Sequence, residues 1–272
     1  MNNSKQISIL GCGWLGIPLA KHFIALGYKV KGSVRREKKI DELKQAEIQA
    51  YLLNIGSNKI EGKITDFLKS SDVLIICIPP GLRKQPNESF VDKIKNLLPF
   101  IAQSAIKKVL FISSTSVYAN DKSIVTENTI PSPETVSGKQ LLATEQLLKK
   151  NAHFQTTILR FGGLIGPGRH PVKTIAGRTG LKNPKAPVNL IHLEDCIGII
   201  QRIIEQEQWA QIFNAAAPYH PSKETYYTEI ASNRGMSTPL FDNQSPSKGK
   251  YIDSHKILDN LKYNFKKSDL AE

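Results

Sequence analysis

The feature that most constrains the fold is a glycine-rich turn that directly follows a short apolar run near the start of the chain. Residues 7–10 alternate like a strand, and Gly11, Gly13 and Gly16 follow in the spacing Gly-x-Gly-x-x-Gly. In this spacing the first glycine permits a tight turn and the second lets the backbone approach a phosphate. The third lets the following helix pack closely on the strand. The motif therefore predicts a strand, a turn and a helix whose N-terminus can hold a pyrophosphate.

The residues after this motif complete a mononucleotide-binding unit. Leu15, Leu19, Phe23 and Leu26 recur at helical spacing, and Gly27 stands where a helix C-cap is expected. Residues 28–34 then have the pattern of a second strand, so strand, helix and strand follow within about thirty residues. We therefore predict a dinucleotide site to which the loop contributes Gly11, Gly13, Trp14, Leu15 and Gly16.

The end of the second predicted strand favours one form of the dinucleotide. An NAD site usually offers an acid there to the adenosine ribose, whereas this chain has Ser33, Arg35 and Arg36. These side chains can bind a ribose 2'-phosphate, and each charge-assisted hydrogen bond to such a group contributes about 1.5 to 3 kcal/mol. The sequence therefore predicts NADP in preference to NAD. The alternative is a solvated basic loop, with NAD as the cofactor.

Strand and helix patterns continue to alternate beyond residue 40. Further strands are expected over 48–55, 72–78, 107–113 and 154–160, and helices over 87–104 and 139–150. This alternation predicts an α/β fold, a Rossmann-type doubly wound parallel sheet. Pro79 begins a Pro-Pro-Gly loop after the fourth predicted strand, and we place it beside the cofactor.

The second half of the chain changes in composition after Arg160. Residues 161–170 form a glycine-rich connection that a buried helix or strand is not expected to contain, so it is expected to line a binding site. Strand-like and helical patterns then return the chain to the sheet. We predict an NAD(P)-binding Rossmann domain over 1–217, with 161–187 contributing to the substrate site, and a small C-terminal substrate lobe over 218–272.

Composition narrows the classes of partner. The net charge is +13 and the pI is about 9.5, but lysines are spread along the chain, which favours a solvated surface over a nucleic-acid interface. No apolar run approaches the roughly 20 residues that span a bilayer, and the polar start lacks a signal-peptide core. We therefore expect a cytoplasmic protein without a membrane or nucleic-acid partner. Cys12, Cys77 and Cys196 have no metal-ligand or disulfide spacing, so no metal is expected.

Several segments, taken together and in order, resemble the extended short-chain dehydrogenase/reductase superfamily, the NAD(P)-dependent epimerase/dehydratases. They are the glycine motif and residues 110–118, 133–145, 158–169, 190–195 and 212–216. The chain has no acid after the second strand. In this and in the residues of the last segments, it is most similar to the atypical, YeeZ-like branch, which lacks the active-site tyrosine.

The resemblance implies a catalytic set of a serine, a tyrosine and a lysine. Ser114 matches the serine and Lys139 the lysine that holds the nicotinamide ribose, but Thr135 occupies the tyrosine position. A threonine hydroxyl is too weak an acid to be tuned toward neutrality as a phenol is, so Thr135 can only orient a substrate or relay a proton. Tyr118 and His170 are the candidates to replace the missing acid. Each has a structural alternative, Tyr118 in packing and His170 as a solvated loop residue.

Two functions follow from the resemblance. The first is an NADP-dependent epimerase, dehydratase or reductase acting on a sugar nucleotide or another small hydroxyl or carbonyl compound. The alternative is a non-catalytic NADP-binding sensor or partner protein, because Thr135 stands where the tyrosine is expected. The family also makes a homodimer a reasonable expectation.

Overall fold

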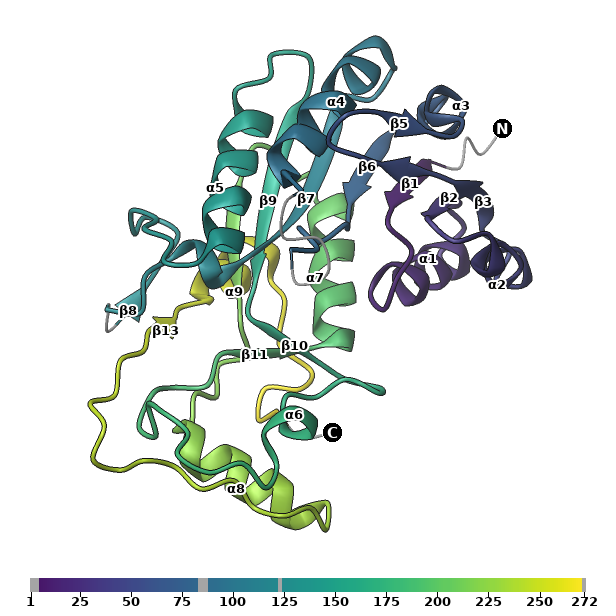
Figure 1. Cartoon of the computed structure of the whole chain (residues 1–272). Helices are drawn as coiled ribbons and strands as arrows, with labels where there is room; N and C mark the ends of the chain where they lie inside the picture. Colours follow the sequence, from purple (N-terminus) through teal and green to yellow (C-terminus); the bar gives the residue numbers. More distant parts are fainter. Residues whose placement is uncertain (1–4, 83–87, 122–123, 271–272) are drawn as a thin grey trace. The chain divides into compact units, whose positions relative to one another are not determined.

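The computed structural model describes residues 5–82, 88–121 and 124–270, and these form two compact units, each built from several chain segments (Figure 1). The first unit consists of Met1–Val117, Pro133–Arg160 and Ile200–Ile212, and the second of Tyr118–Ser132, Phe161–Ile199 and Phe213–Glu272. Both 161–187 and 218–272 fall in the second unit. That these stretches bind a substrate stays a prediction.

The main sheet has seven strands in the order β12-β9-β7-β6-β1-β2-β3. The strands are β1 (Gln6–Leu10), β2 (Lys29–Val34), β3 (Gln49–Leu52), β6 (Val73–Ile76), β7 (Lys108–Ser114), β9 (Gln155–Phe161) and β12 (Ile212–Ala215). The pairs from β3 through β2, β1 and β6 to β7 are all parallel. All four residues of β6 are buried, as expected for a strand covered on both faces. The predicted doubly wound α/β fold is confirmed.

The strand order reverses at β1, which fixes where a ligand can bind. The chain leaves β1 through α1 (Gly16–Ala25) and returns as β2, whereas β6 pairs with the other side of β1. In open parallel sheets, ligands bind beyond the carboxyl ends of the strands at such a reversal. The glycine loop follows β1 and Pro79 follows β6, so both lie beyond the carboxyl ends of the two strands at which the order reverses.

Helices flank the sheet (Figure 1). They include α2 (Ile40–Gln45), α3 (Ile64–Leu68), α4 (Phe90–Gln103), α5 (Val136–Lys149) and α7 (Leu193–Glu205). The helix predicted from residue 139 begins earlier, because the Thr135 hydroxyl accepts a hydrogen bond from the Gly138 N–H and caps it. Among the helices of the described part of the chain, none combines the length and apolar character needed to cross a bilayer.

One predicted strand is divided in two. Residues 48–55 were expected to form a single strand, but β3 ends at Leu52, and β4 (Asn54–Ile55) pairs antiparallel with β5 (Ile60–Glu61). Gly62, directly after β5, lets the chain pass close to the end of β3, since its φ is +102° and a Cβ there would lie 2.2 Å from the Leu52 oxygen. The small β4–β5 hairpin therefore stands next to the carboxyl end of β3.

The expectation that residues 161–170 contain no strand is wrong. Residues Gly163–Ile165 form β10, which pairs in parallel with β11 (Leu190–His192) outside the main sheet. A Cβ at Gly163 would lie 2.6 Å from Leu190 Cδ2, and one at Gly162 would lie 2.7 Å from the Asn189 oxygen. The glycines therefore permit this pairing by close approach.

The second unit is built from short elements around a small core. They are β8 (Ile124–Val125), α6 (Val172–Ile175), α8 (Lys223–Asn233), β13 (Tyr251–Ile252) and α9 (His255–Leu261), besides β10 and β11. Strand β13 pairs with β8. Buried Ile165, Val188, Leu190, Ala217, Tyr226 and Leu270 form one apolar cluster.

Glu207 links three parts of the first unit through its carboxylate. It accepts hydrogen bonds from Lys5 Nζ at 2.8 Å, from Trp209 Nε1 at 2.8 Å and from Lys108 Nζ. Burial opposes the ionisation of Glu207, but the hydrogen bonds outweigh it and lower the pKa of the carboxyl to about 2. The charged form is therefore favoured by folding.

The Glu207→Gln variant should lose stability in a pH-dependent way. The folded pKa lies below the ordinary value of 4.5, so this contribution is present above that pH and is lost as the pH falls toward 2. At pH 7 the variant should lose about 1 kcal/mol, because the side chain is partly exposed and solvent screens the pairs. Urea denaturation from pH 7 to pH 3 should show the difference shrinking, and a constant difference would contradict the prediction. The exposed Glu229→Gln variant is the control.

Candidate functional site

Two neighbouring cavities of the first unit lie at the reversal of strand order. The larger has a volume of about 1310 Å³ and the smaller about 260 Å³. Both are lined by Arg35, Arg36 and residues 79–81, and Gly11 and Gly13 line the smaller one. The larger volume alone exceeds the roughly 300 to 1,000 Å³ of common small-molecule sites, so the pair has room for an extended ligand.

The three glycines of the loop occupy three different environments. The Gly11 N–H donates to Ser33 Oγ at 3.0 Å, and Gly11 has a φ of +105° that favours glycine. A Cβ at Gly16 would lie 2.4 Å from the Gly11 oxygen, so helix α1 packs directly on the turn. A Cβ at Gly13 would meet no atom of the described residues within 4 Å. The loop is thus tight at its two ends and open in the middle, where a phosphate can approach.

Among the described residues, no side chain caps the start of α1 or places a negative charge in its first turn. In the described structure its N-cap, Leu15, makes no side-chain cap, and its first turn carries no acidic residue. The positive end of the helix dipole is therefore not neutralised there. Trp14 is half-buried and Leu15 is buried, and neither is among the described residues that line the two cavities.

Basic side chains dominate the lining after β2. Arg35 and Arg36 are exposed, Ser33 is buried, and Lys39 also lines the smaller cavity. Cys12 lies between the glycines and lines the smaller cavity as well. Burial raises the pKa of its thiol to about 12, so it carries no negative charge. This part of the site is therefore suited to an anionic group.

Sequence reasoning missed two charged residues of the cavities. Glu61 of β5 lines the larger one and accepts hydrogen bonds from Asn54 Nδ2 at 2.9 Å and Lys59 Nζ at 2.7 Å, which lower the pKa of its carboxyl. Lys93 of α4 is buried in the lining of the smaller one and forms an ion pair with Glu88. No local signal in the sequence indicates the hairpin, because each of its strands has only two residues. The sequence likewise contains no signal for Lys93, because its spacing is that of an ordinary helix residue.

The candidate catalytic residues of the first unit cluster at the end of β7 and the start of α5. Ser114 Oγ accepts a hydrogen bond from the Ser116 N–H at 3.1 Å, and Thr135 Oγ1 accepts one from the Gly138 N–H at 3.0 Å. A Cβ at Gly138 would lie 2.4 Å from the Ser116 oxygen, so the two segments pack closely. Lys139 is exposed, and its N–H donates to the Thr135 oxygen at 3.0 Å.

Of these candidates, Thr135 faces the larger cavity, together with Ser116 and Ser137. Ser114 and Lys139 are not among the described residues that line it. The hydroxyl groups at the start of α5 therefore give the cavity its polar wall on this side.

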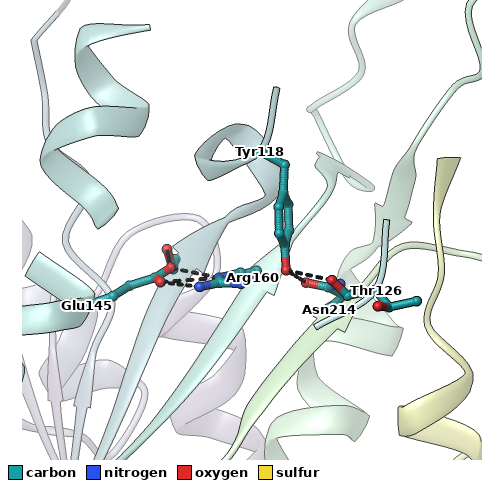
Figure 2. A network of polar contacts seen from close by, with 6 residues as sticks. Tyr118, Thr126, Glu145, Arg160 and Asn214 are labelled. Carbon is teal, nitrogen blue, oxygen red and sulfur yellow. Dashed lines mark hydrogen bonds and ion pairs between the residues drawn. The ribbon is translucent and has the colours of Figure 1, made fainter. Parts of the chain in front are cut away.

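Helix α5 is fixed to the sheet by a buried ion pair (Figure 2). The Arg160 guanidinium of β9 donates from Nε to Glu145 Oε1 at 3.0 Å and from Nη2 to Oε2 at 2.5 Å. Ser113 Oγ of β7 donates to the same carboxylate at 2.6 Å. Both charged side chains are almost fully buried, so removal of one would leave the other uncompensated at a cost of about 3 to 5 kcal/mol.

Tyr118 and His170 both make contacts within the second unit. The Tyr118 hydroxyl lies 2.9 Å from Asn214 Oδ1 and 3.2 Å from the Thr126 oxygen, and the ring is buried (Figure 2). His170 Nδ1 accepts a hydrogen bond from the Val172 N–H at 3.1 Å, and burial lowers the pKa of the imidazole to about 4. These contacts give each residue a structural role. Catalysis by either one stays a prediction.

Comparison with known proteins places the chain among nucleotide-binding proteins. The model of a family described as NAD(P)H-binding matches residues 11–189. Protein YeeZ of Escherichia coli K12 is 34% identical over 267 residues, which cover 97% of each chain. A solved structure from Methylobacillus flagellatus, provisionally named an NAD-dependent epimerase/dehydratase, is 26% identical with a TM-score of 0.77, and the match covers 97% of this chain and 94% of that one.

A more distant solved structure shares the fold. The UDP-glucuronic acid 4-epimerase of Bacillus cereus, in complex with UDP-glucuronic acid and NAD, has a TM-score of 0.79 at 20% identity. The match covers 95% of this chain and 93% of that chain. At this identity the likeness shows the fold alone.

Two glycine variants should separate ligand binding from folding. Gly13→Ala adds a methyl group in open space, so the free energy of unfolding should change by less than about 0.5 kcal/mol, while the rise in Tm caused by a nicotinamide dinucleotide should disappear. Gly16→Ala should lower the free energy of unfolding by about 1 to 3 kcal/mol, because its methyl group meets the Gly11 oxygen. Equal dinucleotide-induced shifts in Gly13→Ala and wild type, measured by differential scanning fluorimetry, would refute this role of the open turn.

Proposed function

The chain belongs to the NAD(P)H-binding, epimerase/dehydratase-like family, and we propose that it holds NADP in the two cavities beside its glycine loop. The observation that carries this proposal is the lining itself. Gly13, which has open space around it and lies next to the uncapped start of α1, lines the smaller cavity together with the basic residues Arg35 and Arg36. The pyrophosphate would lie at Gly13, and the adenosine ribose would lie near the arginines.

The choice of NADP over NAD rests on charge at the end of β2. Ser33, Arg35 and Arg36 stand where an acid would bind the ribose hydroxyls of NAD, and both arginines line the shared part of the cavities. A guanidinium group binds a phosphate through parallel hydrogen bonds. A 2'-phosphate therefore gains contacts that a 2'-hydroxyl does not.

For the substrate, we propose a sugar nucleotide or another small compound with a hydroxyl or carbonyl group. The larger cavity continues past the arginines to Ser116, Thr135 and Ser137, whose hydroxyls can bind a polar ligand. A structural neighbour binds UDP-glucuronic acid together with NAD, which supports this class of substrate.

Each candidate residue has a role that its chemistry allows. When bound, NADP supplies the hydride acceptor, or in its reduced form the donor. Lys139 would hold the nicotinamide ribose through its ammonium group, and Ser114 would orient the reacting oxygen. Thr135 Oγ1 accepts the bond from Gly138, so its hydroxyl hydrogen stays able to donate to a substrate oxygen.

A second candidate function follows from what Thr135 lacks. General acid-base catalysis supplies about 10²- to 10⁴-fold in rate, and losing it raises a barrier by roughly 3 to 5 kcal/mol unless another group transfers the proton. A protein that binds NADP without transferring hydride would need no such group. The alternative is therefore an NADP-binding sensor or partner protein.

The arginines should determine the preference between the two dinucleotides. Arg35→Ala and Arg36→Ala should each weaken NADP binding by roughly tenfold or more, since each removes a charge-assisted contact, and should leave NAD binding almost unchanged. Isothermal titration calorimetry measures both affinities. Lys38→Ala is the matched control, because Lys38 is exposed in the same segment and is not among the described lining residues. Equal wild-type affinity for NAD and NADP would overturn the role of the arginines.

Measurements of turnover should distinguish the proposed enzyme from the proposed NADP-binding sensor. With NADP and a panel of sugar nucleotides, absorbance at the nicotinamide band should show hydride transfer that survives in Thr135→Ala and falls by at least tenfold in Lys139→Ala. The first result is expected because a threonine cannot act as the acid, and the second because the ribose loses its ammonium partner. The control is Lys149→Ala, an exposed lysine of the same helix. Tight NADP binding without turnover on any compound would favour the sensor.

A further inference from the structure

The second unit contains a basic cavity of its own. Its volume is about 320 Å³, and its lining comes from the turn at residues 166–170, from α6, β11 and the start of α7, and from Arg234 and Lys267. Among the described residues, the cavity is lined by one carboxylate, that of Glu194, and by four cationic side chains: Arg169, Lys173, Arg234 and Lys267. None of the described residues that line it also lines the two cavities of the first unit.

A rigid turn forms one wall of this basic cavity. Gly166 and Arg169 exchange both backbone hydrogen bonds, at 3.0 and 2.9 Å, and Gly168 between them has a φ of +71°. Lys173 Nζ reaches back to the Gly168 oxygen at 3.4 Å. The turn therefore presents Arg169 from a fixed backbone, with Lys173 beside it.

A buried carboxylate fixes the backbone at another part of the lining. Asp195 accepts hydrogen bonds from the Lys266 N–H at 2.7 Å, the Lys267 N–H at 3.1 Å and the Tyr263 hydroxyl at 2.8 Å. Its oxygens therefore hold the backbone that carries Lys267. The fourth cation, Arg234, is fixed at the C-cap of α8, where its N–H bonds to the Ile230 and Ala231 oxygens.

Two histidines line the same space. His170 Nδ1 accepts a backbone hydrogen bond, so its Nε2 carries the proton and lies 3.0 Å from the Tyr226 hydroxyl. Burial lowers the pKa of this imidazole most, and the positive charges of Arg234 and Lys173 lower it further. His192 Nδ1 accepts from the Glu194 N–H at 3.3 Å, which leaves Nε2 as the donor of this ring. The cavity thus combines two imidazole rings with four cationic side chains.

We propose that this basic cavity binds the phosphate group of a small phosphorylated ligand. Two arginines and two lysines line a space at the lower end of small-molecule sites, and arginine matches phosphate oxygens through paired donors. The phosphate can belong to a free sugar phosphate or to the diphosphate of a sugar nucleotide. The proposal stands independently of NADP binding in the first unit.

Calorimetric titration of the full chain with glucose 1-phosphate tests the proposal, with glucose as the uncharged match. The wild type should bind glucose 1-phosphate and not glucose. The double variant Lys173→Gln/Arg234→Gln should bind it at least tenfold more weakly. The control double variant Lys185→Gln/Lys248→Gln removes two exposed lysines of the same unit from outside the cavity lining and should bind like the wild type. A melting curve of each variant verifies its fold, and Lys267→Gln replaces the first variant if that one unfolds.

Two further arms identify the source of the phosphate. Equal affinity for glucose 1-phosphate and UDP-glucose would assign the cavity to a single phosphate group. Tighter UDP-glucose binding that the Lys173→Gln/Arg234→Gln variant weakens at least tenfold would assign it to a sugar nucleotide. No binding of either compound at millimolar concentration would overturn the proposal. So would equal weakening in the two double variants, since that would reflect only the overall charge. The same titrations are repeated with NADP at saturating concentration. Loss of glucose 1-phosphate binding while NADP still binds would then show failure of this site and not of the dinucleotide site.

Discussion

The buried contact between Glu145 and Arg160 is the interaction on which the candidate site most depends. It withdraws two charges from water, a cost that is offset only by well-aligned hydrogen bonds, and Arg160 and Ser113 supply these. Through it α5 is bound to both β9 and β7. Because Thr135 and Lys139 begin α5 and Ser114 ends β7, the same contact sets the spacing of all three in the first unit. This ion pair therefore helps to hold the serine, threonine and lysine of the first unit in place.

Much of the fold could be predicted because the relevant signals are local. The alternation of residues 7–10, the glycine spacing and the apolar runs of β6 and β7 each determine one element without reference to the rest of the chain. The β4–β5 hairpin and β10 could not be predicted in this way. Their strands are two or three residues long, and the close approaches of Gly62 to Leu52 and of Gly163 to Leu190 are not indicated by any pattern within such short strands.

The site was predictable to the same extent as its elements. Ser33, Arg35 and Arg36 follow a strand whose end the motif fixes, so their place beside the glycine loop could be foreseen. Glu61 and Lys93 come from a hairpin and a helix, and only the order of strands in the sheet brings these to the cavities. A sequence pattern names residues within an element, but the meeting of distant elements depends on tertiary packing.

The capping bond of Thr135 also bears on how the site can change by mutation. Its hydroxyl satisfies the Gly138 N–H at the first turn of α5, a contact that commonly contributes about 0.5 to 2 kcal/mol to a helix. A tyrosine at this position would bring a phenol but would remove the cap. The position therefore trades acid strength against helix stability, and a reversal would need a compensating change elsewhere in the first turn. The threonine is thus kept in place by folding, whatever its part in chemistry.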